Sequence, residues 1–334
     1  MTGMPAPAYA LGVDIGGTKT LAVMVDDSGH TTGAFEAPTP AADGPVAILG
    51  TAIRLAGGAL AALPPGARTV DAIGVGSAGV IDSATGTVLS ATSSLSDWAG
   101  TDIRRAFQLA FPGLTVTVTN DVQAFTWAEA VHGVAAGSSQ MLGVMVGTGI
   151  GGGLVVRGRL HSGAHSAAGH VGHVVVAEAL GLTCPCGQDG HLEAIASGPA
   201  MTRAYRLAGG SAQDLRAVAE AATRGDGVAR GILEAGADAV GSALGSVANL
   251  LDPELIVIGG GVSGLGAGWL SRVQSAAART TIPAIGTLRI ESGLLGGAAV
   301  AIGAARLARP LPRLPDFASL VPAHAGTSLD SGTP

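Results

Sequence analysis

Apolar runs separated by glycine-rich turns recur along the chain and predict short strands joined by tight turns. In the first such unit, the runs Tyr9 to Val13 and Leu21 to Val25 flank the turn Asp14 to Thr20. In the second, the segment Met141 to Val156 has the same order, with the glycine-rich turn Gly147 to Gly153 at its centre. Two apolar runs joined by such a turn are typical of a β-hairpin. We therefore expect one hairpin at each of these turns.

Longer periodic segments predict helices downstream of the hairpins. Helical spacing of apolar residues is clearest at Val122 to His132, Ala194 to Leu207, Ala212 to Thr223 and Val228 to Asn249. Further strands are expected at Gly74 to Val80, Leu114 to Val118 and Leu255 to Ile258. Two hairpin-and-strand units that feed helices predict a duplicated α/β architecture with a ligand cleft between its halves.

The same pattern divides the chain into lobes. We expect a first lobe over residues 1–118, completed by a C-terminal helix near 293–308, and a second lobe over 119–292. The tail 310–334 is rich in Pro, Ser, Gly and Thr, and we expect it to be mobile.

Composition narrows the class of protein. The 334-residue chain is 47% hydrophobic and 13% charged, which is enough apolar material for one large or two medium domains. Its apolar residues are spread along the whole length, so no membrane span is expected, and the first ten residues lack the features of a secretory signal. A net charge of −6 without a basic run argues against nucleic acid as a partner. We expect a cytoplasmic protein.

Each glycine-rich turn is a candidate phosphate site, because glycines let backbone N–H groups approach an anion closely. In the first turn, Gly16 and Gly17 precede Thr18, a hydroxyl donor, and Lys19, the only lysine of the chain. An isolated lysine among arginines suggests a position where a compact ammonium is wanted. The alternative for this turn is an ordinary tight hairpin.

The second turn offers four candidate phosphate contacts, namely Gly147, Thr148, Gly149 and Gly151. It lacks the Gly-Lys-Ser/Thr ending of a P-loop, and no helical pattern follows directly, as a dinucleotide-binding Rossmann turn requires. Both of those nucleotide folds are therefore disfavoured. A third glycine cluster, with Gly260 and Gly261, follows the strand 255–258 and could cover a nucleotide base or ribose.

A candidate catalytic carboxylate follows the strand Leu114 to Val118. Ligands of open α/β sheets bind at the carboxyl ends of strands, which is where Asp121 falls. A carboxylate there can accept the proton of a sugar hydroxyl while the oxygen attacks the γ-phosphorus of ATP, and Asn120 would orient the same sugar. The alternative is that Asp121 only caps the helix that follows.

Both cysteines and three of the eight histidines lie between Gly169 and Glu193. Cys184 and Cys186 are too close for an easy structural disulfide, whereas two thiolates and two imidazoles meet the tetrahedral demand of structural zinc. We predict one closed zinc site, with the ligands His173, Cys184, Cys186 and His191. The alternative is a pair of buried thiols beside unrelated surface histidines. His170 and Glu193 flank these ligands and are free to contact whatever the loop holds.

Together these residues resemble the ROK family of sugar kinases and repressors. The resemblance spans about residues 9–308 and rests on Asp14-Ile-Gly-Gly-Thr-Lys19, Asn120-Asp121, Gly147-Thr-Gly-Ile-Gly-Gly152, Gly172-His173 and Cys-x-Cys-Gly-x-x-Gly-His-x-Glu from Cys184 to Glu193. It implies a two-lobed, actin-like ATPase fold of the ribonuclease H-like class that closes over a sugar and MgATP, usually as a homodimer or homotetramer.

The resemblance also implies roles for single residues. Asp121 would be the base, and Asp14 and both glycine turns would hold the phosphates. The sugar contacts that it implies are Asn120, His173 and Glu193, and we add His170, Gly79 and Thr92 to them. His173 and the two cysteines would ligate zinc.

Three departures from the family pattern bear on specificity. His170 stands where most members have Glu in a Glu-x-Gly-His motif, and an imidazole both donates and accepts whereas a carboxylate only accepts. The His-x-Gly-His version, followed by Glu-Ala-Ile-Ala-Ser-Gly from Glu193, resembles bacterial N-acetylmannosamine kinases. His191 replaces a usual third cysteine. Ser94 replaces the Asn that glucokinases of this family often show, which weakens the prediction of glucose.

We predict an ATP-dependent kinase, using Mg²⁺ with ATP and structural Zn²⁺, that phosphorylates the 6-hydroxyl of a hexose. N-acetylmannosamine is the preferred sugar and glucose the second choice. A sugar-responsive repressor is disfavoured, because the first turn begins at Asp14 and leaves no room for a preceding DNA-binding domain. A non-catalytic sugar sensor is the remaining alternative, since His170 is altered, and retention of Asp121 weighs against it. His161 and His165 are expected to be loop residues, and Trp98 and Trp127 to pack in the core.

Overall fold

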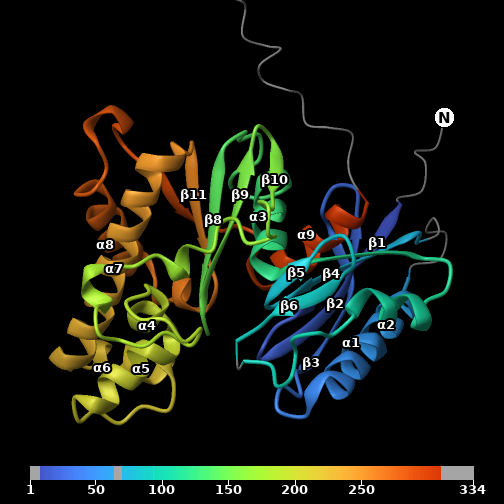
Figure 1. The fold of residues 1–334 in the computed structure, drawn as a ribbon, viewed down its shortest axis with the longest axis horizontal. Helices are drawn as coiled ribbons and strands as arrows, with labels where there is room; N and C mark the ends of the chain where they lie inside the picture. Colours follow the sequence, from blue (N-terminus) through green and yellow to red (C-terminus); the bar gives the residue numbers. More distant parts are fainter. Residues whose placement is uncertain (1–7, 64–69, 93, 310–334) are drawn as a thin grey trace, which may run out of the picture.

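The computed structural model describes residues 8–63, 70–92 and 94–309, and the tail expected to be mobile lies outside them. Two five-stranded sheets organise the described chain (Figure 1). From edge to edge, the first contains β3 (Thr31–Pro38), β2 (Lys19–Asp26), β1 (Tyr9–Ile15), β4 (Ala72–Ser77) and β7 (Thr115–Asn120). The second contains β10 (Arg159–His161), β9 (Ile150–Val156), β8 (Met141–Val146), β11 (Leu255–Gly259) and β12 (Ile290–Ser292).

The two sheets have the same topology. In each, three antiparallel strands from consecutive hairpins are followed by two parallel strands. The carboxyl ends of neighbouring parallel strands therefore align, and Ile15, Ser77 and Asn120 lie side by side at the edge of the first sheet. A small sheet of β5 (Val80–Asp82) and β6 (Thr87–Ser90) lies beside it. The prediction of duplicated α/β halves is confirmed.

Helices form three layers around these sheets. The α-helices are α1 (Gly44–Ala61), α2 (Ile103–Ala110), α3 (Asp121–Val131), α4 (Glu193–Ala196), α5 (Gly198–Leu207), α6 (Leu215–Thr223), α7 (Gly227–Leu251), α8 (Ala267–Ala278) and α9 (Ala299–Ala308). Short 3-10 turns are η1 (Val171–His173), η2 (Ala177–Ala179), η3 (Gly261–Leu265), η4 (Pro283–Ile285) and η5 (Gly296–Ala298). Helices α3 and α9 lie between the sheets, α1 and α2 cover the outer face of the first, and α7 and α8 cover that of the second (Figure 1).

Alternating side chains of the central strands produce this layering. Leu11, Val13 and Ile15 of β1 point toward α1, whereas Ala10 points toward α9. Strand β8 repeats the pattern, since Leu142, Val144 and Val146 face α7 while Met141 faces the middle layer. Because the side-chain period of a strand is two, one strand serves two hydrophobic layers.

The middle layer packs unusually closely against the first sheet. A Cβ atom at Gly12 or Gly74 would overlap backbone atoms of α9, and one at Gly303 of α9 would overlap the carbonyl oxygen of Ala124 in α3. Helix, sheet and helix therefore meet backbone to backbone at these positions.

Several predicted elements differ in detail. The helix expected from Ala194 to Leu207 is interrupted at Ser197, whose hydroxyl caps α5 by accepting a hydrogen bond from Ala200 N. The strand expected from Gly74 to Val80 ends at Ser77, because Gly79 turns the chain with φ +102°. Helices α1, α2 and α8 were not predicted.

Helix α1 is long and apolar enough to cross a membrane by length and composition, with a mean hydropathy of 1.4. No membrane span was expected from the sequence. Here its buried side chains, among them Ile48 and Leu55, pack against the first sheet beside Leu11 and Met24.

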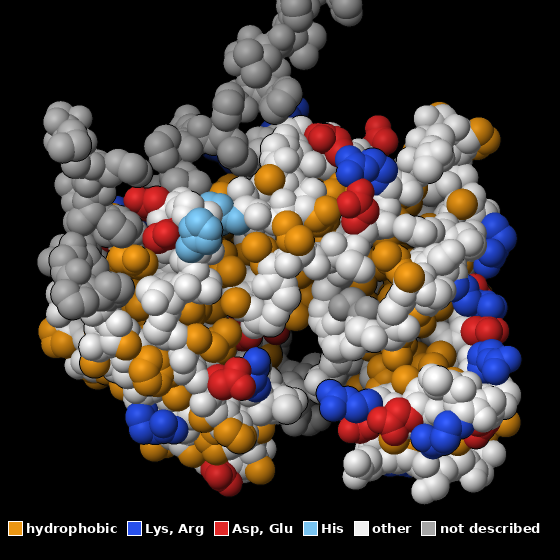
Figure 2. Space-filling view, turned by 180° about the vertical axis from the view of Figure 1, so that it is seen from behind, with side chains coloured by type: hydrophobic (Ala, Val, Ile, Leu, Met, Phe, Trp, Pro, Cys, Tyr) orange, Lys and Arg blue, Asp and Glu red, His pale blue; other side chains and the backbone are white. Residues whose placement is uncertain are grey.

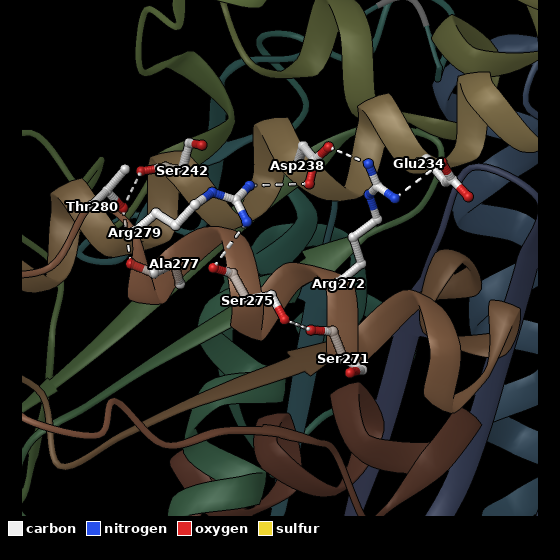
Figure 3. Close-up of polar contacts among 9 residues, drawn as sticks. All are labelled: Glu234, Asp238, Ser242, Ser271, Arg272, Ser275, Ala277, Arg279 and Thr280. Atoms are coloured by element: carbon white, nitrogen blue, oxygen red, sulfur yellow. Dashed lines mark hydrogen bonds and ion pairs between the residues drawn. The ribbon is translucent and has the colours of Figure 1, made fainter.

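Ion pairs join α7 and α8, the two helices that cover the outer face of the second sheet. Arg272 of α8 pairs with Glu234 at 3.0 Å and Asp238 at 2.7 Å on α7, and Arg279 pairs with Asp238 at 3.4 Å (Figure 3). The pKa of Asp238 is lowered, first by its hydrogen bond from Arg272. A groove of about 710 Å³ runs between α6, α7 and α8, where Leu265 and Trp269 form part of its wall.

Candidate active site and metal centre

The molecule is hollowed between its two lobes (Figure 2), and the carboxyl ends of the central strands in both sheets carry the predicted site residues. On the face drawn in Figure 2, basic and acidic side chains are interspersed. The chemistry of this region comes from the two glycine turns, the start of α3 and the loop 170–193.

The first glycine turn joins β1 to β2. Gly16 N donates to the carbonyl oxygen of Lys19 at 3.1 Å, and the hydroxyl of Thr39 donates to Gly16 O at 2.7 Å. Thr18 and Lys19 are exposed, and Lys19 Nζ lies 3.0 Å from Glu36 Oε2. An exposed pair of this kind contributes roughly 0–1 kcal/mol, so Lys19 can be released to a stronger anion.

The second glycine turn joins β8 to β9. Gly147 N donates to Gly149 O at 2.9 Å, and Gly147 O accepts from Gly198 N at 2.8 Å, which ties the turn to the start of α5. Thr148 is exposed, whereas Gly151 packs against Val122 of α3.

The third glycine cluster lies next to the second turn. A Cβ at Gly147 would come within 3.6 Å of Gly261 N, and Gly260, with φ +85°, packs against the backbone of Val146. The structure therefore brings Gly147 and Gly261 together, although 114 positions separate them in the sequence.

Asn120, and not Asp121, caps helix α3. Asn120 Oδ1 accepts from Val122 N at 3.0 Å and Gln123 N at 3.1 Å, while Asp121 Oδ1 also accepts from Val122 N at 2.9 Å, so Asp121 supports the start of the helix without being its cap residue. The amide nitrogen of Asn120 donates to Gly79 O and to Asp121 Oδ1, both at 2.9 Å. Asn120 thus fixes the Asp121 carboxylate. Its predicted contact with sugar stays a prediction.

The carboxyls of Asp14 and Asp121 lie near each other and are both partly buried. Burial, and then the charge of Asp121, raises the pKa of Asp14 to about 8, against the opposing charge of Lys19. Burial also raises the pKa of Asp121, while the Val122 N–H, His170 and Asn120 act in the opposite direction. Paired acids of this kind are common where a carboxylate acts as base or binds a cation.

The loop 170–193 faces these acids from the second lobe. His170 is half-buried, its Nδ1 lies 2.9 Å from Ala167 O, and its charge acts on both Asp121 and Glu193. The Glu193 carboxylate is only 5% exposed, and its Oε2 accepts from Ile150 N at 2.7 Å. Burial raises the pKa of Glu193. Glu193 therefore links this loop to the second glycine turn, a contact that the sequence did not reveal.

The four predicted metal ligands come together. One ligand atom from each of His173, Cys184, Cys186 and His191 lies within 4.8 Å of all the others. The two histidine Nδ1 atoms are 3.2 Å apart, Cys184 Sγ lies 3.7 Å from Nδ1 of His173, and Cys186 Sγ lies 3.2 Å from Nδ1 of His191. The edges of a zinc tetrahedron with ordinary bond lengths are about 3.3 Å between nitrogens and about 3.6 Å between nitrogen and sulfur.

Burial shifts the protonation of the two kinds of predicted ligand in opposite senses for metal binding. Burial raises the pKa of the Cys184 thiol to about 11, so a metal must displace its proton. Burial, followed by His191 and His170, lowers the pKa of His173, which favours the neutral imidazole that ligates metals.

Gly79 and Thr92, the remaining predicted sugar contacts, lie near residues of the site, whereas His161 and His165 do not join the metal cluster. Gly79 lies beside Asn120, and the hydroxyl of Thr92 lies 3.0 Å from that of Ser94, whose side chain approaches Gly17 of the first turn. His161 and His165 are exposed and outside the metal cluster. Trp98 is buried, as expected for packing, but its indole N–H also donates to Ser77 at 3.1 Å.

Known proteins resemble the chain along nearly its whole length. The ROK family profile matches residues 10–310. The chain is 33% identical over 297 residues to N-acetylmannosamine kinase of Yersinia pseudotuberculosis serotype O:1b (strain IP 31758), covering 86% of this chain and 96% of that protein.

Solved structures agree with this assignment. A ROK family glucokinase from Streptomyces griseus, in complex with glucose and AMPPNP, is 32% identical with a TM-score of 0.77, covering 90% of this chain and 99% of that one. The ROK hexokinase from Thermus thermophilus is 30% identical with a TM-score of 0.77, covering 90% and 97%. The chain therefore belongs to the ROK family and is one of its ATP-dependent carbohydrate kinases.

Proposed function

We propose that the protein transfers the γ-phosphoryl group of ATP to the 6-hydroxyl of N-acetylmannosamine. The observation that carries this proposal is the Asp121 carboxylate, which Asn120 holds at the start of α3 and at the carboxyl end of the first sheet. Its raised pKa makes it a stronger base than an exposed Asp. It accepts the proton of the sugar hydroxyl while that oxygen attacks the γ-phosphorus.

The two glycine turns hold the phosphates from opposite lobes. Their glycines leave room for phosphate to approach the backbone, and Lys19 exchanges Glu36 for phosphate at little energetic cost. The Mg²⁺ that accompanies ATP neutralises phosphate charge, and Asp14, which shares a small region with Asp121, is the carboxyl that fits it best.

We infer that the base and ribose occupy the groove between α6, α7 and α8, whose lining includes Leu265, four residues after Gly261. Its volume of about 710 Å³ lies within the usual range of ligand pockets, roughly 300–1,000 Å³. Leu265 and Trp269 supply apolar wall, and the paired side chains of Arg272 and Asp238 lie further along it (Figure 3).

The choice of N-acetylmannosamine rests on His170 and on the relatives that carry that name. His170 lies close to both Asp121 and Glu193, where a neutral imidazole would offer the sugar one donor and one acceptor. Glucose is the second candidate, supported by the glucose-bound Streptomyces griseus relative. A non-catalytic sensor is disfavoured by the placement of Asp121.

We also propose that His173, Cys184, Cys186 and His191 hold one structural zinc ion. The chemistry and spacing of these donors fit zinc, and all four protein positions would be filled, so the ion shapes the loop and takes no part in transfer. Both cysteines are free thiols, which agrees with a cytoplasmic protein. A homodimer or homotetramer is expected, and sedimentation tests it.

The experiment that tests the function is ADP release with MgATP across five sugars, namely N-acetylmannosamine, N-acetylglucosamine, glucose, mannose and fructose. We expect the highest kcat/KM with N-acetylmannosamine and a loss of about 100-fold or more in Asp121→Asn. Asp102→Asn is the matched control, because Asp102 also begins a helix but only caps α2. If Asp121→Asn keeps a turnover close to that of the unaltered protein, Asp121 is not the catalytic base. A preference for glucose would make the second candidate correct.

A further inference from the structure

The chain passes between the two sheets at two places. The first passage runs from β7 into α3, which begins at Asp121, and the second runs from β12 through Gly293 and η5 into α9. Helices α3 and α9 lie together in the middle layer (Figure 1). Any relative movement of the lobes must act on these two segments.

One buried carboxylate holds both passages together. Glu129 of α3 is 0% exposed, its Oε2 accepts from Val134 N at 3.0 Å, and its Oε1 accepts from Leu295 N at 3.0 Å. The second of these bonds spans 166 residues and joins the helix of the first passage to the segment of the second.

Each of the two amides is satisfied by a different oxygen of the Glu129 side chain. A carboxylate has two accepting oxygens, whereas the amide of Gln has one acceptor and one donor group. Burial of a charge is unfavourable unless hydrogen bonds compensate it, and an apolar side chain at position 129 would avoid that cost. The site is also closely fitted, because a Cβ at Gly293 would come within 2.8 Å of Glu129 Oε1.

The segment from Gly293 to Gly297, which Glu129 holds through Leu295 N, runs to the first glycine turn, where we propose that phosphate binds. Gly293 N donates to Ile258 O of β11 at 2.9 Å, so the segment is fixed to the second sheet just before it meets Glu129. Two residues after Leu295, a Cβ at Gly297 would lie 3.9 Å from Lys19 Nζ of the first glycine turn. Glu129 thus connects the helix that carries Asp121 to the segment that adjoins Lys19.

We propose that Glu129 is a positioning residue that sets the alignment of Asp121 against the first glycine turn. Its side chain is fully buried, so we expect it to contact neither sugar nor ATP. It fixes the second passage to α3, so that the sugar hydroxyl activated by Asp121 meets the phosphate held beside Lys19. This inference rests on the proposed roles of Asp121 and Lys19.

The test compares three variants of the full-length, metal-loaded protein. Glu129→Gln removes one of the two accepting oxygens, and Gly293→Ala disturbs the same carboxylate from the opposite side without altering it. Glu254→Gln is the control within one lobe, because Glu254 Oε1 alone accepts the N–H groups of Ser139 and Gln140 at 3.1 Å and the Ser139 hydroxyl at 2.7 Å, so Gln keeps the acceptor there.

Three quantities are measured: kcat with saturating sugar and ATP, sugar Kd by calorimetry, and hydrogen exchange of peptides covering residues 130–136 and 292–298. We expect kcat to fall about 10- to 100-fold in Glu129→Gln and Gly293→Ala, since small misplacements of reacting groups have effects of this size. Sugar Kd should change less than about threefold, and exchange should become faster in at least one of the two peptides. Glu254→Gln should keep the wild-type kcat.

A folded Glu129→Gln with wild-type kcat overturns the inference, as does an equal loss in Glu254→Gln, which would indicate general destabilisation. If Glu129→Gln does not fold, Gly293→Ala decides by the same criteria. If the wild-type protein phosphorylates none of the sugars, the proposed function fails, and the role of Glu129 in holding the two passages together is tested by hydrogen exchange alone. Unchanged exchange at both peptides in Glu129→Gln then excludes that role.

Discussion

The two glycine turns occupy equivalent positions in sheets of the same topology, yet they are supported differently. The first is held by neighbours from its own hairpin and by Thr39, and its lysine is exposed. The second is held by Gly198 and by Glu193, which belongs to the loop with the metal cluster. Two sheets of the same topology therefore carry turns that differ in the residues that hold them and in the roles we propose for them. In the function we propose, the first turn contacts phosphate alone, whereas the second also supports the loop expected to contact the sugar.

The largest effect is expected from a change in the loop 170–193, which contacts the second turn and not the first. Cys184→Ser removes a ligand that is 2% exposed, and the loop that carries Glu193 should lose its shape. We expect loss of bound zinc by elemental analysis and a fall in kcat/KM for sugar of about 100-fold or more. His165→Ala, an exposed histidine outside the cluster, is the control and should keep both. Full activity in zinc-free Cys184→Ser would show that the metal does not support the sugar site.

The next effect concerns the first turn alone. Lys19→Met should reduce kcat/KM for ATP about 10- to 100-fold, because one cationic contact to phosphate is lost, while sugar Kd stays unchanged. Glu36→Gln is the control and should have little effect, since the pair it breaks is exposed. Loss of sugar affinity in Lys19→Met would contradict the division of labour between the turns.

A matched pair of alanine substitutions sharpens the comparison. A Cβ at Gly149 would lie 2.6 Å from Glu193 Oε2, whereas a Cβ at Gly17 would make only an ordinary contact of 3.5 Å with Ser94. We expect Gly149→Ala to raise KM for sugar about tenfold by displacing Glu193. Gly17→Ala should affect KM for ATP and leave sugar Kd unchanged. Equal effects on both substrates in both variants would show that the turns are not functionally distinct.

The smallest effect is on stability and depends on pH. Because the pKa of Asp14 is raised from 3.8 in the unfolded chain to about 8 in the fold, the unfolded chain releases this proton first, so stability falls as pH rises from about 4 and stops falling above about 8. Asp14→Asn should therefore raise Tm by about 2–4 °C at pH 9 and leave it almost unchanged at pH 4. Thermal unfolding of both proteins at the two pH values checks this. An equal shift at both would mean that charge is not the cause.

The sequence was sufficient where chemistry was concentrated in short segments. The two hairpins were visible from apolar runs around glycines, and the metal ligands from four suitable side chains between positions 173 and 191. Asp121 could be placed because the end of a strand and the start of a helix are local signals. Each of these features depends on residues close together in the chain.

Long-range contacts could not be read in this way. The cap role of Asn120, the bond from Ile150 N to Glu193, and the burial of Glu129 beside Leu295 all depend on how distant segments meet. Helix α1 was missed because its alanines and glycines blur the contrast between its two faces, and packing against the sheet supplies that contrast. The interruption at Ser197 was missed because the apolar pattern continues across it.

The backbone contacts at Gly12, Gly74 and Gly303 have a consequence for the tolerance of the chain to change. Most cores accept a new methyl group somewhere, because neighbouring side chains can choose other rotamers. Here the neighbour of each absent Cβ is main chain, which has no such freedom. In a library of all single substitutions, we expect almost no folded variant at these three positions, not even alanine, whereas the surrounding apolar positions should tolerate other apolar residues. Side chains at these positions would have to move α9 away from the first sheet or from α3.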